Sequence, residues 1–322
     1  MAGVHGNRSR FRHAGLAARE VVVLLLILAA AITIFFPYIF QSQVRARRRM
    51  CERRQIELAK ALIRCESFRG EFPGYRNAQA IGSDGRPIPT GWVFPVLPYL
   101  GFNDAKQLPG PWGETFRTHG PDGDAALRGQ TPSVFIADLT CPETPPRDAA
   151  QRKGWTSFVA NTGQPDATPT EEFPADWPAN GVFLDRLAPG ATRCTLAYFE
   201  THDGAERTLL LSENTDTGLW TDFLEARVGF VWVPNLVDGR PDSGDRVLRM
   251  NADRRRGDGS LRVARPASFH GGGVNVAFAS GSTQFIMEKI DYLVFVQLMT
   301  PDDRGLKIPG SDQPVSPPFR IE

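Results

Sequence analysis

The longest apolar stretch of the chain lies close to its N-terminus. Residues 21–40 carry no charge and only one polar side chain, Thr33. Twenty helical residues rise about 30 Å, which is enough to cross the hydrocarbon core of a bilayer. No small-x-small signal cleavage site follows, because the sequence continues directly into the polar, basic residues 41–54. The pattern therefore predicts a membrane-spanning helix that is retained after any processing.

Helix-forming residues continue beyond this stretch with a periodic apolar stripe. Ile56, Ala59 and Ile63 recur at i, i+3 and i+7, and the same face is widened by Leu58, Leu62 and Cys65. Gly70 and Pro73 are expected to end the helix. We predict one long helix over residues 16–67, interrupted or bent only at Pro37, whose first half suits lipid and whose second half suits a protein core.

From residue 71 onward Gly and Pro are frequent, and short β-prone runs alternate with turn signals. The predicted strands lie at residues 92–97, 133–139, 156–160, 181–184, 196–199, 208–212 and 228–233. The predicted loops lie at residues 110–130, 164–180 and 238–262. A Pro-rich tail follows at 301–322, and no internal repeat is present.

The clearest predicted hairpin spans residues 274–286. A two-residue turn at Ser280 and Gly281 would require positive φ at both positions and would place Phe278 opposite Thr283. One face of the hairpin would then be buried, formed by Val274, Val276, Phe278 and Phe285.

Charge is nearly balanced, with a formal net charge of +1, so the sequence predicts no nucleic-acid partner. The basic residues gather just beyond the apolar stretch, where we expect them to contact anionic lipid headgroups. By the positive-inside rule this cluster favours a cytoplasmic body. Its members are Arg45, Arg47, Arg48, Arg49, Arg53 and Arg54.

The four cysteines match no metal-binding spacing. Cys51 and Cys65 would lie about 21 Å apart on one helix, too far for a disulfide. If the body lies outside the cytoplasm, a bridge between Cys141 and Cys194 is possible, and free or buried thiols are the alternative.

His270 stands beside three glycines, an arrangement that invites a catalytic or metal-binding interpretation. We favour a structural role in which the imidazole bonds backbone near the hairpin. The acids Asp203, Glu206, Glu213 and Asp216 could suggest calcium, but no EF-hand spacing is present, and we expect solvated loop charges. No nucleophile elbow or phosphate loop occurs. We therefore expect no enzymatic activity, no cofactor and no metal.

Gly15 is followed by Leu16, by a lone acid at Glu20, and by an apolar span with Pro37 near its end. This order resembles the N-terminus of type IV prepilins and type II secretion pseudopilins. The resemblance implies that a prepilin peptidase removes the basic leader 1–15, that the new N-terminus at Leu16 is methylated, and that Glu20 pairs with the N-terminal amine of a neighbouring subunit. Leu16 and Arg19 depart from the family pattern. The alternative is an uncleaved single-pass anchor.

A series of short motifs then runs through the chain in a fixed order: Glu71-Phe72-Pro73, Trp92 with Leu97-Pro98-Tyr99-Leu100, Cys141-Pro142, residues 157–163, 181–183 and 208–214, and finally His270, Gly272, Ser280 and Gly281. This order resembles a bacterial family of prepilin-like proteins that is catalogued as a domain of unknown function and carries a C-terminal His-x9-Asp-Gly motif. Ser280 replaces the motif's Asp.

Together, residues and resemblances indicate an α+β, pilin-like fold: a transmembrane and spine helix (16–67) packed on a mainly antiparallel sheet body (68–300). The implied function is a non-enzymatic, pseudopilin-like subunit of a secretion or pilus-type assembly in the inner membrane. Its body would face away from the cytoplasm, and its partners would be membrane lipid, the prepilin peptidase and other copies or pseudopilins. The alternative is a membrane-tethered binding module, for example for glycans, or an envelope enzyme with a pilin-like anchor.

Overall fold

The computed structural model describes residues 18–81, 87–102, 135–146, 152, 154–165, 176–187, 191–232, 236–237, 240–241, 249–252 and 264–306. The chain divides into two units, residues 1–46 and 47–322, and each is considered by itself. The longest element, helix α1 (Ala18–Arg69), begins in the first unit and ends in the second.

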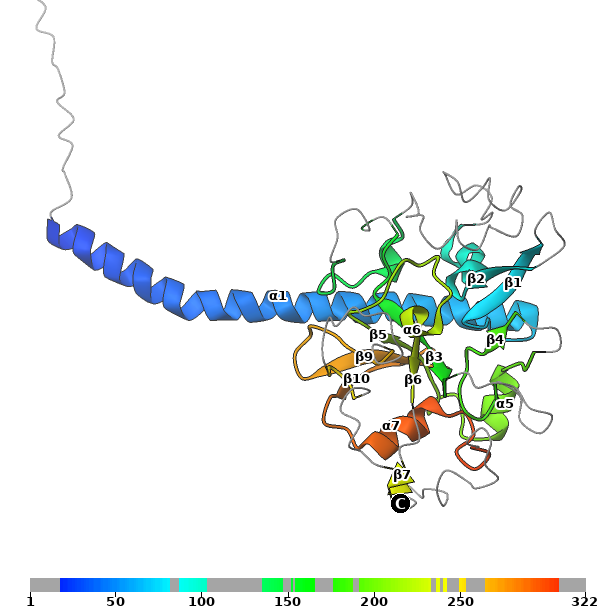
Figure 1. Ribbon diagram of the computed structural model, residues 1–322. Coiled ribbons are helices and arrows are strands. Elements are labelled where there is room, and N and C mark those ends of the chain that lie inside the picture. Colours follow the sequence, from blue (N-terminus) through cyan, green and yellow to red (C-terminus); the bar gives the residue numbers. More distant parts are fainter. Residues whose placement is uncertain are drawn as a thin grey trace, which may run out of the picture. The chain divides into compact units, whose positions relative to one another are not determined.

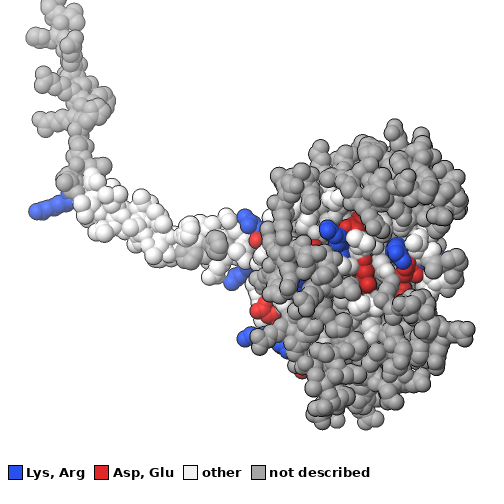
Figure 2. Space-filling view, in the orientation of Figure 1, with Lys and Arg blue, Asp and Glu red and all other residues white. Residues whose placement is uncertain are grey.

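In the first unit, α1 runs through Pro37 without interruption and exposes large apolar side chains on all sides. Their exposure ranges from 39% at Val44 to 73% at Tyr38. Figure 2 shows the described residues of this stretch in white, with charged residues only towards its two ends. By length and composition the helix can cross a membrane.

In the second unit, the remaining part of α1 buries one stripe against the body. The stripe centres on positions with heptad-like spacing, which are fully buried: Cys51, Gln55, Leu58, Leu62 and Cys65. Four of the six residues of the predicted stripe are fully buried, whereas Ile56 and Ile63 are only half-buried. The helix ends where the Gly70 N–H donates to the Glu66 carbonyl at 2.7 Å, close to the predicted end.

The core of the body is a five-stranded sheet with the order β10-β9-β5-β3-β6. Neighbouring strands are antiparallel except for β3 and β6, which run parallel. The prediction of an α+β protein with a long helix packed on a mainly antiparallel sheet is confirmed. The strands are β3 (Phe158–Gly163), β5 (Leu209–Glu213), β6 (Gly229–Val231), β9 (Gly273–Phe278) and β10 (Thr283–Met287).

Helices cover both faces of this sheet (Figure 1). On one face the buried stripe of α1 packs with Phe158, Leu211 and Ala277. On the other face helix α7 (Tyr292–Met299) packs with Val274 and Val276. Neighbouring residues of β9 thus point to opposite cores, as the two-residue period of a strand requires.

Shorter elements surround this core. A second sheet of order β2-β1-β4 contains β1 (Arg76–Ile81), β2 (Pro87–Gly91) and β4 (Asp185–Arg186), and β7 (Leu236–Val237) pairs with β8 (Arg240–Pro241). The remaining short helices are α2 (Val93–Val96), η1 (Leu97–Leu100), η3 (Ala137–Leu139), α5 (Leu196–Thr201) and α6 (Glu225–Val228).

Several predicted strands were wrong. Residues 92–97 and 196–199 form helices, residues 137–139 form a 3-10 turn, and no strand covers 181–184. Short apolar runs suit either a strand or a buried helix, so their composition alone could not decide. At α5 the deciding interaction is a cap, in which the Thr195 hydroxyl accepts from the Tyr198 N–H at 3.1 Å.

The hairpin of β9 and β10 is present, but its register differs by one residue from the prediction. Thr283 pairs with Ala277 rather than with Phe278. The Phe278 N–H donates to the Ser282 carbonyl at 2.9 Å, so the loop contains three residues, 279–281. Within this loop only Gly281 has positive φ, at 83°, and it occupies the left-handed position of a three-residue hairpin. Phe285 therefore lies opposite Asn275, and Ile286 joins the buried face instead.

Candidate functional site

The body buries a cluster of chemically active side chains between α1 and the sheet. His270 Nε2 lies 3.0 Å from Glu213 Oε2 and 3.3 Å from Cys141 Sγ, and Cys141 forms a disulfide with Cys51. The side chains of His270 and Glu213 are fully buried. We call these four residues the His270 centre.

Backbone geometry places His270 in this cluster. Gly271 and Gly272 follow it with φ of 63° and 82°, a left-handed conformation that residues with a side chain rarely adopt. The Ser268 hydroxyl accepts from the His270 N–H at 3.2 Å and donates to the Gly273 carbonyl at 2.7 Å. The glycines beside His270 thus turn the chain so that the imidazole points inward and β9 can begin.

The imidazole does not bond backbone as the sequence led us to expect. Its described neighbours are instead a carboxylate and a sulfur, and its Nδ1 has no hydrogen-bond partner among the described residues. The expected backbone partner was wrong, because Glu213 comes from a strand 57 positions earlier in the chain.

Glu213 ends β5 and is held by the neighbouring strand β9. Its Oε1 accepts from both the backbone N–H and the side-chain amide of Asn275, at 3.0 and 2.6 Å. Asn275 is tied to α1 in turn, because the Gln55 amide donates to its carbonyl at 3.1 Å. These bonds leave Oε2 facing His270, and Oε2 has no hydrogen-bond partner among the described residues although it lies close to Nε2.

The cysteine pairing differs from the expected alternatives. Cys141 bonds to Cys51 across a sequence separation of 90, whereas Cys65 and Cys194 are free and buried. The sequence could not select Cys51, because only the packing of α1 against residues 139–144 brings the two Cα atoms within 5.1 Å. Burial raises the pKa of Cys65 to about 11 and raises that of Cys194 as well, so both remain thiols at neutral pH.

The acids that were expected to be solvated loop charges separate into different environments. Only Glu206 is exposed. Glu213 belongs to the His270 centre, and Asp216 Oδ2 lies 3.2 Å from a guanidinium nitrogen of Arg265 in a pair whose side chains are both fully buried. The expectation was wrong for these two residues because strand β5 carries the segment into the interior.

Asp203 lies in a second acidic cluster with Asp302 and Asp303. Its Oδ2 accepts from the Asp303 N–H at 2.7 Å. Partial burial, followed by the nearby charges of Asp303 and Asp302, raises the pKa of Asp203 to about 6.

The predicted processing residues Gly15 and Leu16 lie outside the described residues. Glu20 lies in the first turn of α1 and is exposed, and Pro37 lies within the same helix. The family-motif residues fall in two places: His270 and Gly272 precede β9, whereas Ser280 and Gly281 form the exposed loop that follows it. The structure therefore does not bring the two ends of the motif together.

Part of the basic cluster that was expected at lipid headgroups contacts protein instead. Arg48 lies over the Phe285 ring, with its guanidinium carbon 3.6 Å from the ring centroid. Arg54 donates to the Thr140 hydroxyl at 3.1 Å. These arginines fix α1 to the body, so the sequence count overstated the charge available to lipid.

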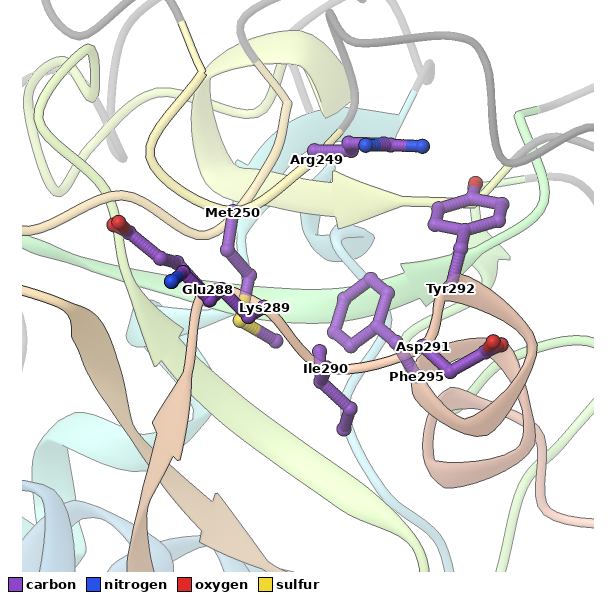
Figure 3. Close-up of a pocket in the computed structure, with 8 residues that line it drawn as sticks. All are labelled: Arg249, Met250, Glu288, Lys289, Ile290, Asp291, Tyr292 and Phe295. Carbon is purple, nitrogen blue, oxygen red and sulfur yellow. The ribbon is translucent and has the colours of Figure 1, made fainter.

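A pocket of about 350 Å³ lies between the turn after β10 and the start of α7. In Figure 3, Met250 and Phe295 occupy its centre, Arg249 and the Tyr292 hydroxyl lie along one side, and the carboxylates of Glu288 and Asp291 point outward at opposite ends. Its described lining therefore combines an apolar floor with charges of both signs. Sequence patterns did not indicate this pocket, because its described walls come from two segments far apart in the chain, residues 249–250 and 288–295.

Among the described residues, four tryptophans are buried and belong to the core rather than to a sugar-binding surface: Trp92, Trp155, Trp220 and Trp232.

Two members of the His270 centre were missed as site residues. Glu213 lies two residues after the apolar run Leu209–Leu211, and a charge at the end of a fully buried strand was the available signal. Cys51 precedes Gln55 by four residues and Leu58 by seven, a heptad-like spacing that marks it as part of the buried stripe.

The fold and the site define a class of protein: an α+β protein in which a helix able to span a membrane continues into a body built around a buried histidine, glutamate and disulfide. Residues 44–293 match the model of a family described as a protein of unknown function (DUF1559). The chain belongs to this family, which confirms the expected domain of unknown function. No curated protein and no solved structure matches the chain.

Proposed function

We propose that the protein is a non-enzymatic, pseudopilin-like subunit of a secretion or pilus-type assembly, anchored in the inner membrane with its body outside the cytoplasm. The observation that carries this proposal is α1 itself. One continuous helix exposes apolar side chains on all sides before residue 40 and buries only one stripe after residue 50. Such a division suits a helix that packs in lipid and among other copies at one end and carries a folded body at the other.

The proposal includes removal of residues 1–15 by a prepilin peptidase and methylation of the new N-terminus at Leu16. Mass spectrometry of the membrane-extracted protein tests this step. The expected N-terminus is methyl-Leu16 in the native chain and Met1 in a Gly15→Leu variant. Gly6→Leu is the matched control, because it changes another leader glycine and should leave processing intact. An intact Met1 in the native chain would exclude processing and leave an uncleaved anchor.

The proposal also includes self-association in which Glu20 pairs with the N-terminal amine of a neighbour. An unpaired carboxylate in lipid is costly, so this pairing would stabilise the assembly. Two differently tagged copies should co-purify from detergent extracts, and Glu20→Leu should reduce the recovery by roughly tenfold. Thr33→Val is the control, because the Thr33 hydroxyl already donates to the Ala29 carbonyl of its own helix at 2.6 Å. Strictly monomeric native protein in these extracts would contradict the assembly role.

A further inference from the structure

The His270 centre brings together four groups that commonly bind transition metals. One ligand atom from each of Cys51, Cys141, Glu213 and His270 lies within 4.8 Å of the other three. All four residues are buried, and they come from α1, from the segment before β3, from β5 and from the loop before β9. In the oxidised protein the two sulfurs are joined to each other.

We propose that reduction of the Cys51–Cys141 disulfide converts the His270 centre into a binding site for a thiophilic divalent metal of the Zn²⁺ type. This inference does not depend on the proposed assembly role. It departs from the expectation, drawn from the sequence, that His270 is purely structural and that the chain holds no metal.

The chemistry of the donors supports this assignment. Two thiolates, one imidazole and one carboxylate form a mixed set of soft, borderline and hard ligands, all of which occur in tetrahedral zinc sites. Bonds of about 2.0–2.3 Å place the ligand atoms of such a site about 3.3–3.8 Å apart. The described atoms already lie within this range or near it, since His270 Nε2 is 3.3 Å from Cys141 Sγ and 3.0 Å from Glu213 Oε2.

Glu213 provides an independent argument. Its Oε1 is fixed by two bonds from Asn275, whereas its buried Oε2 points at His270 and has no hydrogen-bond partner among the described residues. The one described polar neighbour of Oε2 is the imidazole, 3.0 Å away, and a buried carboxylate is costly unless it is fully paired and hydrogen-bonded. Outer bonds that orient a ligating carboxylate are also a regular feature of metal sites. A cation held between Oε2, Nε2 and the sulfurs would satisfy this oxygen.

The conversion is chemically balanced. An external dithiol transfers two electrons, breaks the S–S bond and leaves thiols at Cys51 and Cys141, while the dithiol itself becomes a disulfide. The metal then replaces the two thiol protons, which are released to solvent. Nε2 of His270 binds through its lone pair with the ring proton on Nδ1, and Glu213 binds through Oε2. The link between α1 and the segment before β3 therefore persists in both redox states.

The full chain in detergent tests this proposal, with Co²⁺ as a spectroscopic probe. After reduction by a phosphine and removal of the reductant without oxygen, we expect one Co²⁺ per chain with a sulfur-to-cobalt charge-transfer band. The oxidised protein should bind none. His270→Gln should weaken binding by roughly tenfold or more, because the glutamine side chain is of similar size but removes the imidazole ligand.

Cys65→Ser/Cys194→Ser is the matched control, because these cysteines are also buried but lie outside the centre. This variant should bind Co²⁺ as the native chain does, and Zn²⁺ should protect its two remaining thiols from alkylation. Three results would overturn the proposal: a folded, reduced chain that binds no Co²⁺; binding that is lost in the control; or binding unchanged in His270→Gln. Unfolding on reduction that Zn²⁺ does not reverse would overturn it equally.

Discussion

The two units of this protein depart from the usual distribution of side chains in opposite ways. The first exposes large apolar residues, such as Leu26 at 65% and Phe36 at 67% exposure. The second buries ionisable residues, among them Arg265 and Glu213, both fully. In soluble proteins charged residues are almost never fully buried unless they are paired, and extended apolar surface marks a contact with lipid or protein.

The difference teaches how specific each environment must be. Apolar side chains in lipid need only to be apolar, because the hydrophobic effect has no direction. A buried charge needs a particular partner at a particular distance, since desolvation is costly unless hydrogen bonds and opposite charge offset it. Substitutions should therefore be tolerated in the first unit as long as they stay apolar, whereas even isosteric changes should be costly in the interior of the second.

The largest effect should come from breaking the apolar character of the first unit. Replacing Leu28 and Ile32 by arginine places two charges near the middle of the span, each costing about 2.5–3.5 kcal/mol at a helix centre. We expect the double variant to lose most of its carbonate-resistant membrane fraction. The control Leu28→Phe/Ile32→Phe should remain membrane-bound. Full retention of the arginine variant would contradict a membrane-spanning role for this helix.

A single isosteric change in the body should have an effect nearly as large as that of the two arginines in the first unit. Asp216→Asn removes the charge that faces Arg265 in a fully buried pair and should lower the free energy of unfolding by about 3–5 kcal/mol. Urea unfolding followed by tryptophan fluorescence measures this loss. The matched control is Lys60→Met, which breaks the exposed pair with Glu57 and should cost less than about 1 kcal/mol. Equal effects of the two variants would remove the contrast between buried and exposed charge.

A smaller effect concerns pH. The pKa of Asp203 is about 6 in the folded protein against an ordinary value of 3.8, so the folded state binds its proton more tightly than the unfolded state does. This residue therefore contributes stability below pH 3.8 that is lost as the pH rises to about 6. Asp203→Asn should be more stable than the native chain above pH 6, and the difference should vanish towards pH 4. Thermal unfolding at several pH values checks this.

Glu206→Gln, which alters an exposed acid of the same loop, is the control for Asp203 and should leave the pH dependence of the native chain unchanged. If Asp203→Asn is no more stable than the native chain above pH 6, solvent screens the charges of Asp203, Asp302 and Asp303, and the expectation is wrong.

The smallest effect should come from Ser280→Asp, which restores the residue expected from the family motif. The Ser280 hydroxyl lies 2.9 Å from the Ser282 hydroxyl and 3.4 Å from the Ser282 N–H. A carboxylate at position 280 should accept hydrogen bonds from both of these groups more strongly than the hydroxyl does. It should therefore stabilise the loop by about 0.5–1 kcal/mol. The melting temperature should rise slightly, and Ser280→Ala should not raise it. A gain of calcium or zinc affinity in Ser280→Asp would contradict a purely structural role for position 280.

The local pattern of the sequence was sufficient to predict the long helix, most of the central strands and the α+β class. Residues 21–40 could be assigned without a structure because a run of apolar residues specifies its environment by itself. The strands β3, β5, β6 and β9 also lie close to the predicted runs. The errors fell on short segments, where an apolar run of four residues suits a strand or a helical turn equally well.

Only the tertiary structure decided the hairpin register, the partner of Cys141 and the environment of His270. Each depends on a contact between residues that are far apart in the chain, such as Cys51 with Cys141 or Glu213 with His270. The sequence by itself determined which segments are apolar and which local conformations they favour, because these properties depend on neighbours in the chain. It could not determine which polar groups meet in the interior, because that depends on how the helix and the sheet pack together.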